Sequence, residues 1–210
     1  MRAYGIALAL LLATGCKSSG DASTPVASTS ASIQDIRDAV TNTKTGVDTA
    51  VSALTALTET NEGGLKKSYD RYGSALAGLK ASALEARDHL IQLKLRRDAY
   101  LSKSLELSKD VKSPELRAGA EKRRTAVMDA FMTLNGKAQE ARNAFAPIYG
   151  SLEDCRRFME SDFTMSSAAA LKGELDEIRK DQKGFADAAD ALVAELAALQ
   201  AKVSSVAPPK

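Results

Sequence analysis

The 210-residue sequence has no tryptophan, five tyrosines, five phenylalanines and a single histidine, His89. His89 is therefore the one histidine that could act as the base of a catalytic triad. Zinc and di-iron sites that need several histidine ligands are not expected. The Glu-x-x-His pattern that supplies di-iron ligands in helical bundles does not occur in the sequence. We expect no enzyme, no metal site and no cofactor.

Cysteine is almost as scarce, since Cys16 and Cys155 are the only two. If Cys16 is acylated, as argued below, no intramolecular disulfide can form. Cys155 falls at an apolar position of a predicted helix. A buried, inert thiol is the simpler interpretation of Cys155, and a redox or intermolecular role is the alternative.

The charges balance, with 29 Lys and Arg against 27 Asp and Glu. Removal of Arg2 with an N-terminal signal leaves 28 against 27, a net formal charge of +1. Because affinity for nucleic acid depends on neutralising many phosphates, this balance argues against a nucleic-acid partner.

The sequence begins MRAYGIALALLLATGCKSSG, in which residues 5–13 form a continuous apolar run. A bilayer span needs about 20 such residues, whereas a secretory signal needs about 7 to 15. The end of this stretch, Ala13 to Cys16, resembles a bacterial lipobox, in which the cysteine is acylated, with palmitate among the acyl chains. An ordinary secretory signal is the alternative, and both interpretations make residues 1–15 a signal peptide.

Residues 16–31 contain the predicted lipidated cysteine and a stretch rich in Ser, Ala and Thr. We expect a flexible tether there, with a typical reach of about 20 Å. Lys17, directly after the cysteine, resembles the outer-membrane sorting signal of enteric bacteria. The expected location is therefore the cell envelope, as an outer-membrane lipoprotein that faces the periplasm and contacts the membrane through its anchor.

From Ile33 onwards apolar residues recur every seven positions, which is the spacing of a packed helical seam. The predicted helices are 32–59, 65–110, 114–161 and 165–204, followed by a disordered tail at 205–210. Short turns make consecutive helices antiparallel. The predicted fold is therefore all-α, an elongated antiparallel four-helix bundle or coiled coil with a long central helical hairpin projecting at one end.

Three sites interrupt this pattern. Gly63 and Gly64 end the first helix, and Ser113 followed by Pro114 has the sequence of an N-cap and first helical position. Pro147 lies inside the third helix, where a proline removes a hydrogen bond and clashes with the preceding turn. We expect a kink or a short break at Pro147.

The predicted helix lengths make residues 95–122 project beyond the bundle, at the end where residue 31 joins it. KLRR and EKRR meet in this hairpin and form what we call the basic band. Its members are Lys94, Arg96, Arg97, Lys122, Arg123 and Arg124. Beside a lipid anchor the band is a candidate contact for anionic head groups, at about 1 kcal/mol for each basic residue near a charged surface. The alternative is a solvated face balanced by Asp98, Glu106 and Glu121.

Several stretches carry a family resemblance. PIYGSLEDCRRF from Pro147, followed by SSAAALKGELDEI from Ser166, resembles an uncharacterised family of bacterial exported proteins, mostly lipoproteins, known only as a domain of unknown function. GGLKKSYDRY from Gly63 is similar to the start of that family's long central helix. The resemblance spans about residues 61–200. It implies a helical fold and an envelope address, and it implies no activity, substrate or cofactor.

Two functions are compatible with these features. The first is a lipid-anchored envelope protein of unknown biochemical activity that acts as a structural or protein-interaction module, with an envelope protein as its partner. The second is a lipid or small-ligand binding protein that uses an opened seam of the bundle near Pro147.

Overall fold

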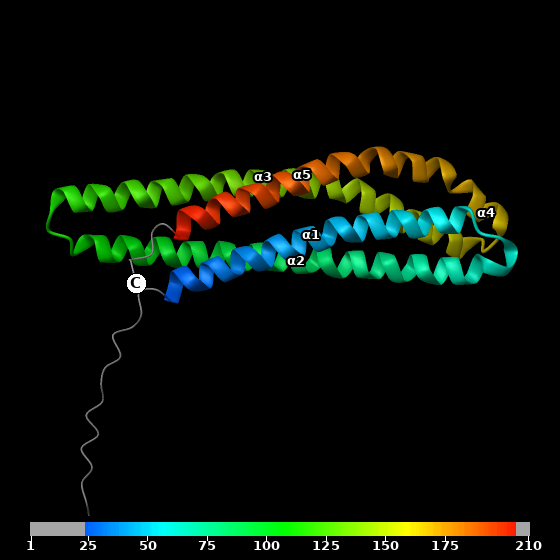
Figure 1. The fold of residues 1–210 in the computed structure, drawn as a ribbon, viewed down its shortest axis with the longest axis horizontal. Coiled ribbons are helices and arrows are strands. Elements are labelled where there is room, and N and C mark those ends of the chain that lie inside the picture. Colours follow the sequence, from blue (N-terminus) through cyan, green and yellow to red (C-terminus); the bar gives the residue numbers. More distant parts are fainter. Residues whose placement is uncertain (1–23, 205–210) are drawn as a thin grey trace, which may run out of the picture.

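A computed structural model describes the backbone of residues 24–204 and the side chains of residues 32–202 (Figure 1). Its elements are α1 (Thr24–Thr58), the 3-10 helix η1 (Glu62–Gly64), α2 (Leu65–Lys109), α3 (Pro114–Ser161), α4 (Met165–Ala170) and α5 (Lys172–Ser204). No strand occurs among the residues described, so the predicted all-α class is confirmed. None of the helices within 24–204 combines the length and apolar character needed to cross a bilayer.

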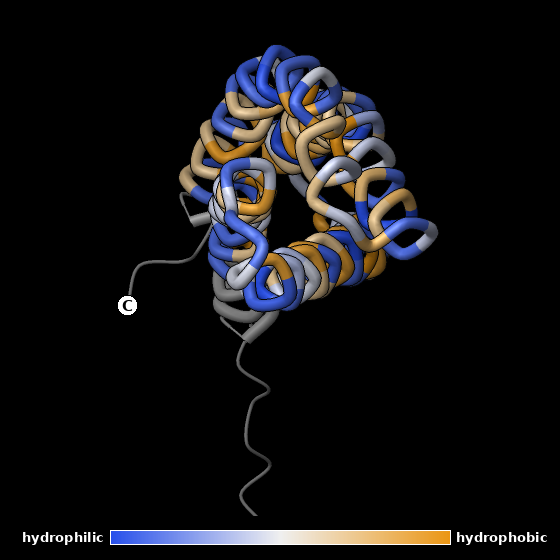
Figure 2. The backbone as a smooth tube through the Cα atoms, turned by 90° about the vertical axis from the view of Figure 1, so that its right-hand side faces the viewer, coloured by the Kyte–Doolittle hydropathy of each residue, from blue (hydrophilic) through white to orange (hydrophobic). Residues whose placement is uncertain are grey.

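The helices form an elongated antiparallel bundle. α1 lies along α2 and also contacts α5, and α5 lies along α3. The α2–α3 hairpin extends past the start of α1 and the end of α5, as predicted (Figure 1). Seen along the long axis, the helices surround a common centre (Figure 2). We call the end with the α2–α3 turn the proximal end and the end with η1 and α4 the distal end.

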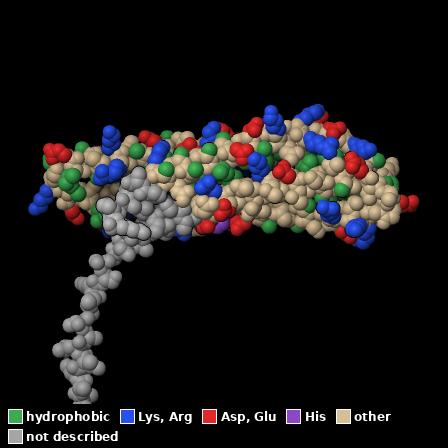
Figure 3. Space-filling model, viewed as in Figure 1, with side chains coloured by type: hydrophobic (Ala, Val, Ile, Leu, Met, Phe, Trp, Pro, Cys, Tyr) green, Lys and Arg blue, Asp and Glu red, His purple; other side chains and the backbone are tan. Residues whose placement is uncertain are grey.

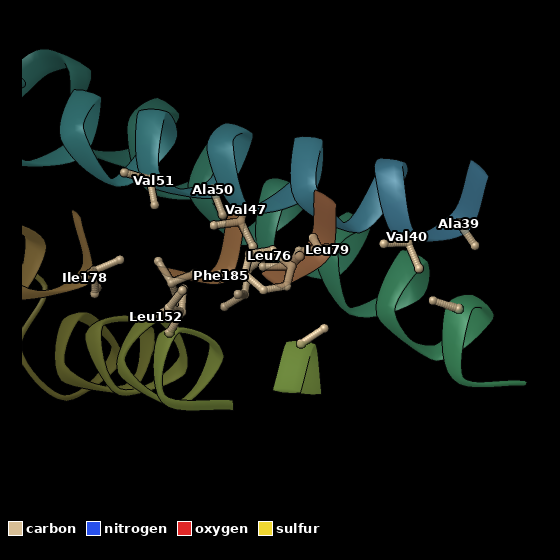
Figure 4. Packing of buried hydrophobic residues seen from close by; sticks show 14 of the residues in the cluster. Ala39, Val40, Val47, Ala50, Val51, Leu76, Leu79, Leu152, Ile178 and Phe185 are labelled. Atoms are coloured by element: carbon tan, nitrogen blue, oxygen red, sulfur yellow. The ribbon is translucent and has the colours of Figure 1, made fainter. Parts of the chain in front are cut away.

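The core consists of the heptad rows. Ile33, Ile36, Leu54 and Leu57 of α1 are fully buried and meet equally buried residues of the other helices. Figure 4 shows α1, α2, α3 and α5 contributing side chains to one apolar cluster that includes Val47, Leu79 and Phe185. Complete burial of a Leu or Ile side chain contributes about 1.5 to 3 kcal/mol. The period of 3.5 residues read from the sequence is therefore the packing period of the bundle.

One glycine lets two helices come close together. A Cβ at Gly46 of α1 would lie 3.1 Å from Leu79 Cδ1 and 3.2 Å from Leu79 Cα of α2. Side chains this close require the neighbour to shift, and the neighbour here includes backbone. Gly46 therefore permits a close α1–α2 approach that a larger residue would oppose.

The predicted tether is partly wrong, because α1 begins at Thr24 instead of at residue 32. The apolar row of Ile33 and Val40 extends back by one heptad to Val26, a continuation that the Ser-rich composition concealed. Pro25 also suits the first turn of a helix, where its missing N–H needs no partner. Residues 1–23, with the predicted signal peptide and Cys16, lie outside the described residues, as does the predicted tail 205–210.

The last two helical predictions also need correction. The fourth helix is interrupted at Leu171, where a ψ of −8° departs from the helical value near −42° and separates α4 from α5. α3 continues through Pro147 without the short break that was one of the two expectations, and the other, a kink, stays a prediction. Both Pro147 and Asn143, whose carbonyl loses its usual helical donor, are exposed. Water can therefore solvate that carbonyl, and the helix does not have to end.

Candidate functional site

The distal turn between α3 and α4 is held by a compact set of side-chain hydrogen bonds. The Thr164 hydroxyl accepts from the Ser167 backbone N–H at 3.2 Å, which caps α4. The Ser167 hydroxyl donates to the Asp162 carboxylate at 2.6 Å. These contacts fix the chain on both sides of Phe163, whose ring is 44% exposed. The turn thus holds an aromatic ring at the surface.

A second helix supports that ring. Tyr69 of α2 packs edge-on against Phe163 with ring centroids 5.3 Å apart, and its hydroxyl donates to Glu160 at 3.1 Å. Phe158, on the last turns of α3, is 43% exposed. We call Tyr69, Phe158 and Phe163 the distal aromatic surface. Tyr69 itself is half-buried, at the rim of the bundle.

A charged network lies beside the distal aromatic surface on α3. Arg156 bonds Glu153 through Nε at 3.2 Å and Glu160 through Nη1. The Tyr149 hydroxyl donates to Glu153 at 2.7 Å. This hydrogen bond, together with the Arg156 charge, lowers the pKa of Glu153, while burial and the same bond raise the pKa of Tyr149 to about 12. At neutral pH Glu153 is therefore ionised, Arg156 is cationic and Tyr149 is a neutral phenol.

Tyr72 anchors α2 to α3 below this network. Its side chain is fully buried, and its hydroxyl donates to the Leu152 carbonyl. Burial, followed by the negative fields around it, raises the pKa of Tyr72 far above its usual value. The phenol is thus a permanently neutral hydrogen-bond donor that fixes the register of the two helices.

A shallow hollow opens next to Phe158. The residues around it are Asp154, Cys155, Phe158, Ala170, Leu171 and Glu174. Cys155 forms part of its wall but is only 2% exposed, and burial, followed by the negative charge of Glu174, raises its pKa to about 12. Thiolate is the reactive form of cysteine. The predicted burial of Cys155 is confirmed, and its thiol is protonated and unreactive at neutral pH.

At the proximal end the structure divides the basic band into two groups. Lys94, Arg96, Lys122 and Arg123 are exposed. Arg97 instead turns inward, with its guanidinium 5.8 Å from the centroid of the Phe131 ring and an ion pair to Asp98 at 2.7 Å. Arg124 pairs with Glu121 at 3.8 Å and its side chain is 22% exposed. The role of the band in binding head groups stays a prediction.

The seam near Pro147 is filled by side chains. Ile148 and Leu152 are fully buried. Phe145 lies between two rings, with centroids 5.6 Å from Tyr149 and 5.5 Å from Phe185. A ligand at this seam would therefore have to displace packed aromatic groups.

The chain's one histidine, His89, lies on α2. Its side chain is half-exposed and lies 3.7 Å from Glu85. Within the part of the chain that the structure describes, no three His, Cys, Asp or Glu side chains are grouped to hold a metal ion. Both signs of charge alternate over the face in Figure 3. What the described arrangement offers is a binding surface, since exposed aromatic rings beside an arginine are typical of protein interfaces.

The sequence pointed to the basic band and missed the distal network. The signal was present in the spacing, because Glu153, Arg156 and Glu160 follow one another at three and four residues, the separation of neighbours on one helix face. Such spacing is common on solvated helices, so it did not distinguish this site. Only the meeting of α2 with α3 adds Tyr69 to it.

Comparison with known proteins agrees with the resemblance read from the sequence. A family model described as "Protein of unknown function (DUF2959)" matches residues 29–203. No curated protein and no solved structure matches the chain. Because the match covers most of the sequence, the chain belongs to the DUF2959 family of proteins of unknown function.

Proposed function

We propose that this protein is a lipid-anchored module of the cell envelope, without catalytic activity, that holds a protein-binding surface away from the membrane. Acylated Cys16 supplies the anchor, and the outer membrane, on its periplasmic side, is the proposed location. The observation that carries this proposal is the opposition of the two ends. α1 begins beside the projecting hairpin, whereas the distal aromatic surface lies at the other end (Figure 1).

The length of the bundle sets the distance between the proposed anchor and the distal aromatic surface. α1 has 35 residues, which at 1.5 Å per residue corresponds to about 50 Å. The core is packed along this length by fully buried side chains, and a packed antiparallel bundle resists bending. An anchor at residue 16 would therefore keep the distal aromatic surface tens of ångströms from the bilayer, where a partner in the periplasm has access to it.

The distal aromatic surface suits a protein partner better than a small ligand. Phe158 and Phe163 are each more than 40% exposed, and large rings at interface centres commonly contribute about 2 kcal/mol or more to binding. The neighbouring Glu153, Arg156 and Glu160 provide charged groups for a polar rim. The alternative of a lipid or small-ligand site at the Pro147 seam lacks comparable support, since Phe145 and Ile148 fill that seam.

Two measurements test the proposal in cells that produce the full chain. Labelled palmitate is expected to be incorporated into the full chain and not into its Cys16→Ser variant, and a full chain without label would contradict the anchor. A photo-crosslinking residue at position 163 is expected to capture a discrete protein. The matched control places the same residue at Gln139, an exposed position of α3 away from both ends. Equal capture at the two positions, or none at 163, would refute the distal docking surface.

A further inference from the structure

The proximal hairpin and the rest of the bundle carry opposite net formal charges. Residues 94–124 contain ten Lys and Arg and five Asp and Glu, a net charge of +5. The rest of residues 32–204 contains sixteen Lys and Arg and twenty-one Asp and Glu, a net charge of −5. The near neutrality of the whole chain therefore conceals a basic proximal hairpin on an acidic body.

Exposed apolar side chains are concentrated in the same region. Ten large hydrophobic residues are exposed within the described part of the chain, and four of them, Leu95, Leu105, Leu107 and Leu116, lie in residues 94–124. Leu107 is the clearest case, because it belongs to the heptad row of Leu79 and Leu93 yet is 58% exposed. Leu105 and Leu116, which flank the α2–α3 turn, are 46% and 67% exposed. Isolated exposed leucines are ordinary, but a group at one end of a molecule indicates a contact surface.

Helix pairing explains why these leucines are uncovered. Gly46 lies against Leu79, so in an antiparallel pair Thr24 reaches the level of about residue 101. Phe145 packs on Phe185, which brings Ser204 to the level of about residue 126. About ten further residues of α2 and α3 thus project past the four-helix part, a distance of about 15 Å. We call this segment, residues 102–125, the tip.

The proposed anchor is joined to the bundle at the base of the tip. Cys16 and Thr24 are separated by seven residues, which makes eight steps from Cα to Cα, and a chain of that length reaches at most about 28 Å. A bilayer that holds an acyl chain on Cys16 therefore lies within about 28 Å of the start of α1. The tip extends about 15 Å from the same level, so it can meet that bilayer.

We propose that the tip is a second membrane contact, in which Leu105, Leu107 and Leu116 enter the interface of an anionic bilayer while exposed basic-band residues face the head groups. The tip contains seven Lys and Arg and four Asp and Glu, and its net charge of +3 complements an anionic surface. The leucines supply apolar area that water otherwise contacts. For the choice of membrane the inference rests on the proposed function, because the anchor brings the tip to a bilayer. Two contacts at one end would set the orientation of the rod.

The absence of tryptophan offers a direct test. A single tryptophan is introduced as Leu107→Trp in the full chain carrying Cys16→Ser, so that no acyl chain contributes. With vesicles of phosphatidylcholine containing about one third phosphatidylglycerol, we expect a blue-shifted emission and quenching by lipids brominated along their acyl chains. Phe163→Trp at the distal end is the matched control and should keep its emission in water. Leu107→Trp emission that is unchanged, or changed equally with Phe163→Trp, would overturn the proposal.

Charge variants test the electrostatic part. Replacement of Lys109, Lys122 and Arg123, three exposed basic residues of the tip, by Gln should lower the affinity for the anionic vesicles at least about tenfold and reduce its salt dependence. The control replaces three exposed lysines of the acidic body, Lys67, Lys172 and Lys183, and should change the affinity less than about twofold. Each variant retains the same N-terminal apolar run, so the difference comes from the bundle. Equal losses in the two triple variants would contradict a directed contact.

A second copy of the chain is the competing occupant of the tip, and sedimentation without lipid distinguishes it. If the unsubstituted chain sediments as a dimer and the Leu107→Gln, Leu116→Gln double variant sediments as a monomer, the tip mediates self-association. Together with an absence of any lipid effect on the tryptophan emission, this result would overturn the membrane contact. The outcome for the proposed function is read separately from palmitate labelling in cells, which the tip does not affect. Each hypothesis can therefore fail alone.

Discussion

The two ends of this bundle use the same heptad pattern under different conditions. At the distal end all the long helices are present, and aromatic rings and a charged network close the structure. At the proximal end α1 and α5 stop first, so apolar residues of the same rows face solvent. The difference shows that a heptad position has no fixed burial of its own. Burial depends on how many helices reach that level of the rod.

The largest expected effect compares two leucines of one heptad row. Leu79→Ala should lower the free energy of unfolding by about 2 to 5 kcal/mol, because Leu79 is fully buried among four helices. Leu107→Ala should lower it by less than about 1 kcal/mol, because Leu107 is 58% exposed. Urea denaturation followed by circular dichroism measures both. Similar losses would mean that the tip is covered in solution.

The next largest effect on stability is expected from substitutions of two glycines in different surroundings. Gly46→Ala places a methyl group 3.2 Å from the Leu79 Cα, and overpacking of about 1 to 3 kcal/mol should outweigh the gain in helix propensity. Gly136→Ala meets nothing within 4 Å on α3. It should raise the melting temperature, with a gain of about 0.5 to 1 kcal/mol. A stabilising Gly46→Ala would show that α1 and α2 are less closely packed than the structure indicates.

Two tyrosines of α2 each donate a hydrogen bond to α3, one at a buried site and one at the surface. Tyr72→Phe removes the bond to the Leu152 carbonyl from a fully buried site and should cost about 1 kcal/mol of unfolding free energy. Tyr69→Phe removes an exposed bond to Glu160 and should cost less than about 0.5 kcal/mol. Thermal unfolding of both variants tests this order, and a larger loss for Tyr69→Phe would contradict it.

The smallest effect is a pH dependence at the distal network. The pKa of Glu153 is lower in the folded chain than its ordinary value of 4.5. Its ionised form therefore stabilises the fold above about pH 4.5, and this contribution disappears as the pH falls through the lowered value. Glu153→Gln should reduce stability at pH 7 and lose this effect near pH 3, as measured by urea denaturation at both values. Glu121→Gln at the proximal end is the control. If the free energies of unfolding of the unsubstituted chain and of Glu153→Gln differ by the same amount at both pH values, Glu153 does not contribute to the pH dependence of stability.

Much of the fold was predictable from local patterns. The row through Ile33 and Leu54, the Ser113–Pro114 cap and the glycines of the first turn led to helix ends that mostly agree with the structure within one residue. The start of α1 was missed because a single valine in a Ser-rich stretch is weak evidence of periodicity. The contact between Tyr69 and Phe163 was not predictable, because the two residues are distant in sequence and meet only after the chain folds.

The sequence by itself determined the helices, their antiparallel order and the projecting hairpin, since heptad spacing and short turns act over neighbouring residues. It also carries the lipobox resemblance on which the proposed anchor depends. Only the tertiary structure decided which heptad positions are buried, that Arg97 turns toward Phe131 and that Leu107 meets solvent. These outcomes depend on where α1 and α5 end relative to α2 and α3, because the hydrophobic contribution of a side chain exists only where another helix is present to cover it.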